Sequence, residues 1–313
     1  MRISSTQYQN TMSSALQSAQ SNVEMTLEQM ASGQKLRLPS DDPGTAVRLG
    51  RLSREEASLD QYLSNISAMR TRLQQNETLM DGMVNDVMQA RDLMVWASDG
   101  ANTSDDVKAM SSTVANLRDS LLYSANTKDQ EGRYVFSGTA TATKAITGVV
   151  VNGVEGAPYT FTGNTDEQKV VVGADVTQTT NVNLHDIAAL LNQLDAVAKA
   201  LSPAPATPGG PSPEVSVNDP ATRATLKAGL DGLDSALDYL NGKIATQGGA
   251  QNTLDTLQSN HENVSLSNKQ AALTLGALDY GDAAIKLQSY STALEATQKA
   301  YAKVSGLSLF DVL

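Results

Sequence analysis

The segment MSSALQSAQSNVEMTLEQM (residues 12–30) decides the fold, because it carries small or apolar side chains at alternating steps of four and three. Near the other end, LQSYSTALEATQKAYAKV (residues 287–304) repeats the pattern. This spacing draws one apolar seam along a helix and is typical of packing against another helix. We therefore predict that the two ends pack against each other or against other copies of the chain. The seam positions are Met12, Leu16, Ala19, Val23, Thr26 and Met30 at one end, and Leu287, Tyr290, Leu294, Thr297, Tyr301 and Val304 at the other.

Long helices are predicted between these ends. One apolar heptad position recurs seven times over residues 43–99, and the chain returns through leucine stripes at 219–241 and 244–278. Further helices are predicted at 5–32, 104–130, 184–201 and 282–305, with Asp42, Thr103, Asn183 and Asp219 placed as N-caps. The heptad residues are Leu52, Leu59, Ile66, Leu73, Met80, Val87 and Met94.

The character of the chain changes at residue 133. Three short β-branched runs, 149–153, 159–163 and 170–173, end in turn residues and predict a small β-rich region over 133–182. Residues 202–213 are rich in Pro, Ala and Gly and predict a surface loop.

These patterns predict a mainly α fold, an elongated antiparallel helical rod or coiled coil formed by the N- and C-terminal regions, with a small β-rich insertion. We predict three parts. Residues 1–42 with 281–313 form a terminal coiled-coil assembly domain. Residues 43–132 with 219–280 form a helical rod domain. Residues 133–218 form a β-rich outer insertion with a short helix and a Pro-rich loop.

Charge and composition limit the classes of partner that the chain can have. The net charge is −11, yet residues 1–37 sum to +1 and residues 281–313 to 0, so the acidic excess lies in the middle. Near-neutral ends can pack densely, while an acidic chain without a basic stripe is a poor partner for nucleic acid. There is no cysteine and no apolar run long enough to span a membrane. Because residues 1–8 have neither an apolar h-region nor a cleavage site, we expect no secretory leader. We expect no membrane partner and, if the chain is secreted, a route that leaves its N-terminus uncut.

Candidate chemistry is sparse, and we predict no catalytic, cofactor or metal site. His185 and His261 lack metal-ligand spacing and are expected to be surface or capping residues. Asp41 and Asp42 suit a helix start, where carboxylates stabilise exposed N–H groups. A third acidic group is expected to be a solvated helix face: Asp231, Asp234 and Asp238.

Three motifs stand out: the turn MASGQKLRLPSDDPG (residues 30–44), the segment GRYVFSGT (132–139) and the ending SLFDVL (308–313). They resemble the N-terminal signature, the central segment and the ending of the hook-associated protein 3 family, within the flagellin superfamily. The motif residues singled out are Pro39, Ser40, Asp41, Asp42 and Pro43 in the turn, and Arg133, Phe136 and Gly138 in the central segment.

The resemblance implies a non-enzymatic, secreted protein of the extracellular bacterial flagellum, exported by the flagellar type III apparatus and forming the junction between hook and filament. It implies a ring of copies in contact with hook-associated protein 1 and flagellin. It also implies an export chaperone that holds the C-terminal helix at Leu287, Leu294, Tyr301 and Val304.

The apolar side chains at the two ends exceed what the ends can bury against each other. Because one partner helix cannot bury every apolar side chain of the N-terminal segment, we predict that the ends order fully only when neighbouring subunits cover them. The alternatives are a flagellin-type filament subunit, a type III secreted tip protein and an enzyme. Pro39, Pro43 and the SLFDVL ending favour the junction over the filament, and neither membrane-active stretches nor a catalytic trio is present.

Overall fold

The computed structural model describes residues 2–151, 154–203 and 213–310. Two compact units are present: a terminal unit, Met1–Asp60 with Glu262–Leu313, and a central unit, Gln61–His261. Each boundary falls inside a long helix, so both units hold a part of α2 (Pro43–Ala97) and of α5 (Pro220–Gly276).

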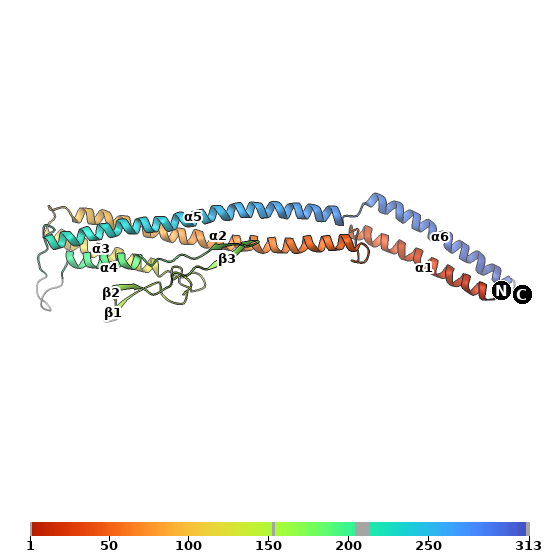
Figure 1. Cartoon of the computed structure of the whole chain (residues 1–313), viewed down its shortest axis with the longest axis horizontal. Coiled ribbons are helices and arrows are strands. Elements are labelled where there is room, and N and C mark those ends of the chain that lie inside the picture. The colour runs from red at the N-terminus through yellow and green to blue at the C-terminus, as the bar shows by residue number, and fades with distance from the viewer. Residues whose placement is uncertain (1, 152–153, 204–212, 311–313) are drawn as a thin grey trace. The chain divides into compact units, whose positions relative to one another are not determined.

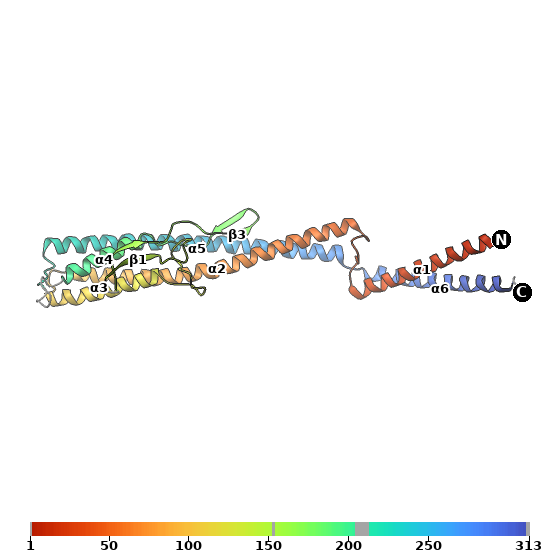
Figure 2. The same cartoon turned by 90° about the horizontal axis from the view of Figure 1, so that it is seen from below.

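In the terminal unit, α1 (Arg2–Ser32) and α6 (Tyr280–Phe310) lie side by side, with the start of α1 beside the end of α6 (Figures 1 and 2). The predicted stop of the first helix is confirmed, because Gly33 follows α1 with a φ of 69°. A side chain there would be strained, since only glycine adopts this region at no steric cost.

The central unit is built on the antiparallel pairing of α2 and α5 (Figure 1). Cross-helix contacts run in opposite directions along the two helices: Arg70 meets Asp255, Glu77 meets Gln251 and Met80 meets Gln247. The heptad prediction for α2 is confirmed, because six of its seven positions are buried and Leu52 is half-buried. The buried six are Leu59, Ile66, Leu73, Met80, Val87 and Met94.

Three predicted N-caps are confirmed. Asp42 Oδ1 accepts the backbone N–H of Thr45 at 3.1 Å before α2, and Asp219 Oδ2 accepts that of Thr222 at 3.1 Å before α5. Thr103 forms a capping box with Asp106 at the start of α3 (Ser104–Ala125). These carboxylates and hydroxyls pair N–H groups that the first helical turn leaves free.

Three helix predictions are wrong in detail. The helix predicted at 184–201 begins later, as α4 (Ile187–Leu201), because the Asn183 side chain contacts the His185 ring at 3.0 Å instead of capping the helix. Helix α3 ends at Ala125, since the Asn126 side chain turns to the backbone of Ile146. Helix α5 is one continuous helix through Gly248 and Gly249, not two.

The β-rich region is present as two separate antiparallel hairpins. The first pairs β1 (Ile146–Val151) with β2 (Val154–Phe161), and the second pairs β3 (Lys169–Gly173) with β4 (Val176–Thr179). The first hairpin packs on α4, where the amide of Asn192 bonds both the N–H and the C=O of Tyr159. The second packs on α2 and α5, where Val172 is buried beside Ile66 and Leu254.

The predicted fold class is confirmed: the chain is mainly α, with paired long helices from its N- and C-terminal regions and a small β-rich insertion. The three-part domain division remains a prediction, and the two compact units do not test it. Among the residues described, no helix is both long and apolar enough to cross a membrane.

Candidate assembly surface on the terminal helices

The terminal heptads form the contact between α1 and α6. On α1, Thr26 is buried, and Met12, Leu16, Ala19, Val23 and Met30 are half-buried while their neighbours are largely exposed. On α6, Ala283 is buried and Leu287, Tyr290, Leu294 and Thr297 are half-buried. Tyr301 is exposed, and the side chain of Val304 lies outside the described residues. The structure thus brings most of the predicted seam residues together but buries few of them fully.

The inner ends of the two helices are joined by backbone contacts. Lys35 donates its N–H to the C=O of Gly276 at 2.8 Å, and Leu278 donates to that of Gly33 at 3.0 Å. The Tyr280 hydroxyl donates to the Met30 carbonyl at 3.1 Å. A Cβ at Gly33 would lie 3.2 Å from that hydroxyl, so the glycine also makes room for the contact.

The turn between α1 and α2 is held by its two aspartates. Asp41 Oδ2 accepts the backbone N–H groups of Arg37 and Leu38 at 3.1 and 2.9 Å. Asp42 caps α2, and the side-chain hydrogen bond from Thr45 lowers the pKa of the Asp42 carboxyl. Pro43 is the first residue of α2, where its missing N–H costs nothing. In the same turn Pro39 and Ser40 are exposed.

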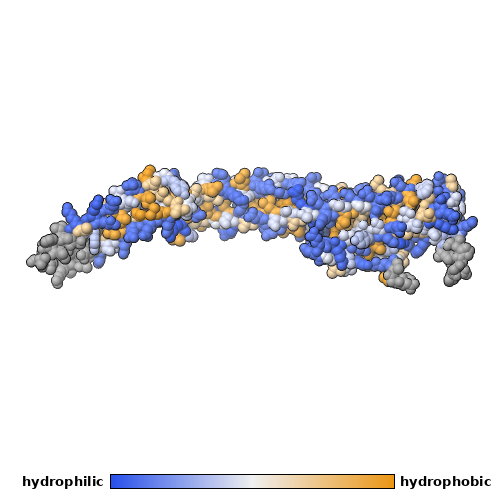
Figure 3. Space-filling model, turned by 180° about the vertical axis from the view of Figure 1, so that it is seen from behind, coloured by the Kyte–Doolittle hydropathy of each residue, from blue (hydrophilic) through white to orange (hydrophobic). Residues whose placement is uncertain are grey.

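A second strip, made of small or uncharged residues, lies on the opposite face of α6, and the sequence interpretation missed it. We call it the outer strip; its seven members are exposed small or uncharged residues, of which Ile285 is the largest at 71% exposed. Figure 3 shows, on the face that it presents, that orange apolar side chains reach the surface among blue hydrophilic ones. A spacing of three and four, offset from the inner seam, was the signal that could have found it. The members are Ala284, Ile285, Gln288, Ser289, Thr292, Ala293 and Ala296.

The central motif residues have structural roles. Arg133 pairs with Asp129 at 3.0 Å and with Glu131 at 2.8 Å. Phe136 is fully buried in the core of the central unit. Gly138 has a φ of 72°, and a Cβ there would lie 2.0 Å from the Asn164 carbonyl oxygen. These residues fix the start of the β-rich region.

The remaining candidates do not form a reactive site. In the described residues no cluster of three or more His, Cys, Asp or Glu side chains could hold a metal ion. Asp231 pairs with Lys227 and Asp234 with Arg91, as on a solvated helix face. His185 is largely exposed, whereas His261 is half-buried and contacts the Val172 carbonyl oxygen at 2.8 Å, so it helps to hold the second hairpin.

Sequence comparisons match the chain to flagellar proteins. Residues 3–141 match the family described as the bacterial flagellin N-terminal helical region. The chain is 28% identical over 298 residues to flagellar hook-associated protein 3 of Escherichia coli strain K12, covering 91% of each chain.

Solved structures agree with this match. A flagellar hook-associated protein from Vibrio parahaemolyticus aligns at 30% identity with a TM-score of 0.64, over 75% of this chain and 99% of that one. The flagellar junction protein from Legionella pneumophila aligns with a TM-score of 0.55 over 72% of this chain and 100% of that one, and its 13% identity supports the fold alone. The paired terminal helices, the inserted hairpins and these matches show that the chain belongs to the flagellar hook-associated protein 3 family of the flagellins.

Proposed function

We propose that this chain is a structural, non-enzymatic subunit of the bacterial flagellum that forms the junction between hook and filament. The observation that carries the proposal is the pair α1–α6, which has an inner seam for contact within the chain and an exposed outer strip of uncharged residues with Ile285 among them. An exposed face of this kind is typical of a surface that binds another protein.

In the proposed assembly, copies of the chain form a ring between hook-associated protein 1 and flagellin. The terminal helices pack as a coiled coil around the central channel, and the β-rich insertion faces outward. The assembly residues are the inner-seam positions of both ends, which a neighbouring copy would cover further: Met12, Leu16, Val23, Met30, Leu287, Tyr290, Leu294, Tyr301 and Val304.

Before assembly, the chain would be exported unfolded by the type III apparatus with its N-terminal segment as an uncleaved signal. A cytoplasmic chaperone would hold the C-terminal helix at Leu287, Leu294, Tyr301 and Val304. The absence of cysteine suits such a route, because no disulfide must be broken for the chain to unfold.

Deletion of the gene in a motile bacterium tests the proposal. We expect swimming to be lost, hooks to remain, and flagellin monomers to appear in the medium. Long filaments formed by the purified chain alone would instead favour a flagellin-type subunit, and retained filaments in the deletion strain would contradict a junction role.

Variants of the outer strip sharpen this test. Ile285→Asp places a charge on the exposed face and should leave folding unchanged within about 0.5 kcal/mol, as at most surface positions. It should nevertheless fail to restore filaments, because a buried, unpaired carboxylate would oppose contact with a neighbour. Ile285→Leu is the matched control and should restore them. Equal swimming with both variants would remove the outer strip from the interface.

A further inference from the structure

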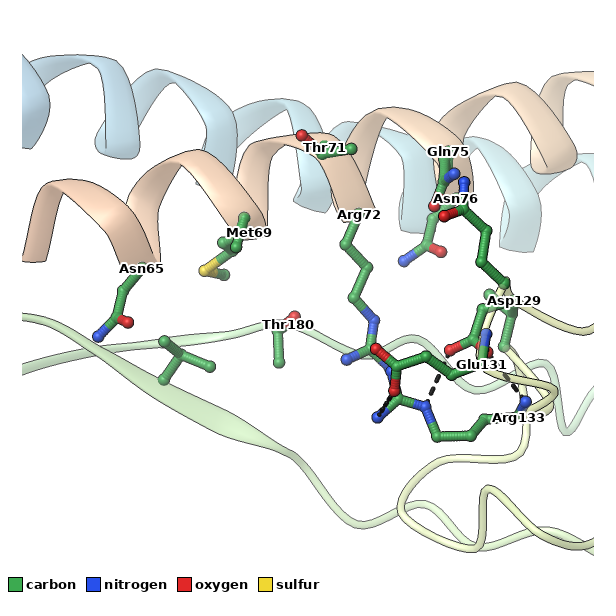
Figure 4. Close-up of a pocket in the computed structure, with 14 residues that line it drawn as sticks. Asn65, Met69, Thr71, Arg72, Gln75, Asn76, Asp129, Glu131, Arg133 and Thr180 are labelled. Atoms are coloured by element: carbon green, nitrogen blue, oxygen red, sulfur yellow. Dashed lines mark hydrogen bonds and ion pairs between the residues drawn. The ribbon is translucent and has the colours of Figure 1, made fainter. Parts of the chain in front are cut away.

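A polar hollow lies in the central unit between α2 and the loop that carries Asp129 and Arg133. Its volume is about 400 Å³. Figure 4 shows the side chain of Arg72 extending from α2 toward this loop, with Arg133 approaching from the other side. Asn76, one turn further along α2, also lines the hollow. Thr180, which follows β4, closes another wall.

Asn76 is the first unusual feature of the hollow. Only 1% of the residue is exposed, and its Nδ2 group has no hydrogen-bond partner among the described residues. Buried amide donors are nearly always paired, because leaving one unpaired costs the full desolvation of the group. Asn76 also occupies the heptad position of Met69, Met83 and Ala90, where an apolar residue would pack. The position therefore carries a donor that the fold itself does not use.

Arg72 is the second unusual feature. Its one hydrogen bond goes to Gln168 Oε1 at 3.1 Å, and within the described part of the chain it makes no ion pair. A guanidinium has five N–H donors, so most of its donors are uncommitted. Burial, and next the nearby Arg133 guanidinium, lower the pKa of Arg72, while Asp129 and Glu131 offset part of this effect.

The two carboxylates that line the hollow, Asp129 and Glu131, favour the charged form of Arg72 from a distance, but neither forms an ion pair with it among the described residues. Asp129 Oδ1 accepts the backbone N–H groups of Glu131 and Arg133 at 2.9 Å each, and Asp129 Oδ2 accepts Arg133 Nε at 3.0 Å. Glu131 Oε2 pairs with Arg133 Nη1 at 2.8 Å. Both carboxylates are bound directly by the loop backbone or by Arg133, so among the described residues most N–H donors of Arg72 and the Nδ2 group of Asn76 have no direct partner and are available to a ligand.

We propose that this hollow binds an oxyanion of carboxylate or phosphate type, with Arg72 and Asn76 Nδ2 as its donors. Arginine donors in a fork and a side-chain amide suit the paired oxygens of such a group. The anion has two sources: a free ion from solution, or an acidic side chain of a neighbouring subunit. The proposal goes beyond a junction role, since the hollow lies within one unit of one copy.

The first arm of the test uses the full-length chain with citrate and inorganic phosphate as probes. The side-chain resonances of Arg72 and Asn76 are followed by NMR at constant ionic strength, with chloride as the reference ion. A free ligand predicts saturable shifts that chloride does not cause. Arg72→Gln and Asn76→Leu should each weaken binding roughly tenfold to a hundredfold, the loss expected for a charge-assisted hydrogen bond.

Each variant has a matched control. Arg70→Gln removes an arginine of the same helix whose partners, Asp255 and Gln258, lie on α5 outside the hollow. Gln247→Leu removes another buried amide, which does not line the hollow. Both should retain the response. A response that survives Arg72→Gln, or that Arg70→Gln abolishes equally, overturns the proposal as general charge screening.

The second arm tests whether the anion is an acidic side chain of a neighbouring subunit. If the isolated chain binds neither probe, Arg72→Gln should still reduce filament attachment in the complemented deletion strain, while Arg70→Gln should not. If neither arm responds to Arg72→Gln, there is no oxyanion site. That failure leaves the junction role untouched, because it is judged by the wild-type gene in the same strain.

Discussion

Arg118 and Asp195 form a buried ion pair that joins α3 to α4, with 2.6 Å between Nη1 and Oδ1. Only 15% of the Arg118 side chain and 8% of the Asp195 side chain are exposed. The second carboxylate oxygen of Asp195 is paired with Lys199 at 2.6 Å, so the buried charge is satisfied on both sides. The Arg118 guanidinium also lies over the aromatic ring of Tyr159, with 5.9 Å between its carbon and the ring centroid. The ion pair therefore joins two helices and the first hairpin.

Replacement of this aspartate should be costly. Among the residues that the structure describes, Asp195→Asn leaves Arg118 with only the exposed Asp119 as an acidic partner, and breaking a buried pair typically costs about 3–5 kcal/mol. Urea unfolding followed by circular dichroism measures the loss. Asp231→Asn is the control, because its pair with Lys227 is exposed and should be worth less than about 1 kcal/mol. Equal destabilisation by both variants would contradict this account.

Replacement of either of two glycines in α5 by alanine should change the free energy of unfolding, with a decrease at one and an increase at the other. A Cβ at Gly229 would lie 2.7 Å from Val197 Cγ2 and 3.0 Å from Met94 Sδ, whereas a Cβ at Gly242 would meet nothing within 4 Å. Overpacking at Gly229 should cost about 1–3 kcal/mol, while Gly242→Ala should gain about 0.5–1 kcal/mol from helix propensity. The denaturation midpoints of the two variants should move in opposite directions from that of the wild type.

The free energy of unfolding at acidic pH should depend on the cap of α3. The side-chain and backbone hydrogen bonds from Thr103 lower the pKa of Asp106 below its ordinary value of 3.8. Because the folded state holds the proton less tightly than the unfolded state, this contribution is complete above about pH 5 and is lost as the pH falls through the lowered pKa.

Asp106→Asn removes this titration. We therefore expect the free energy of unfolding of the variant to be lower than that of the wild type at pH 7, and the difference to narrow between about pH 5 and pH 3. Unfolding by urea at fixed ionic strength across this range provides the measurement. A difference that stays constant with pH would show that the carboxylate charge is not what stabilises the cap.

The sequence predicted those features that depend on local or periodic signals. Heptads placed Ile66 and Met80 in the core, and the caps at Asp42 and Thr103 follow from hydrogen bonds within four residues. The start of α4 was missed because Asn183 has another partner, an effect of tertiary context that no local rule contains. The hollow was missed although Asn76 interrupts an apolar heptad position, because its neighbours Asp129 and Arg133 are distant in sequence.

The last prediction concerns the order of the terminal helices. The inner seam of α1 and α6 is mostly half-buried, whereas Ile66, Met80 and Val87 on α2 are fully buried. Hydrophobic stabilisation scales with the apolar area removed from water, so the α1–α6 pair has less to offset the conformational entropy of ordering its residues.

We expect residues 12–30 to exchange their amide hydrogens in the free monomer much faster than residues 66–87. Hydrogen exchange with mass spectrometry on dilute protein provides the comparison, and the same peptides isolated from intact flagella should be protected because neighbouring subunits cover the seam. Slow exchange throughout residues 12–30 in the monomer would mean that the two helices stabilise each other without an assembly.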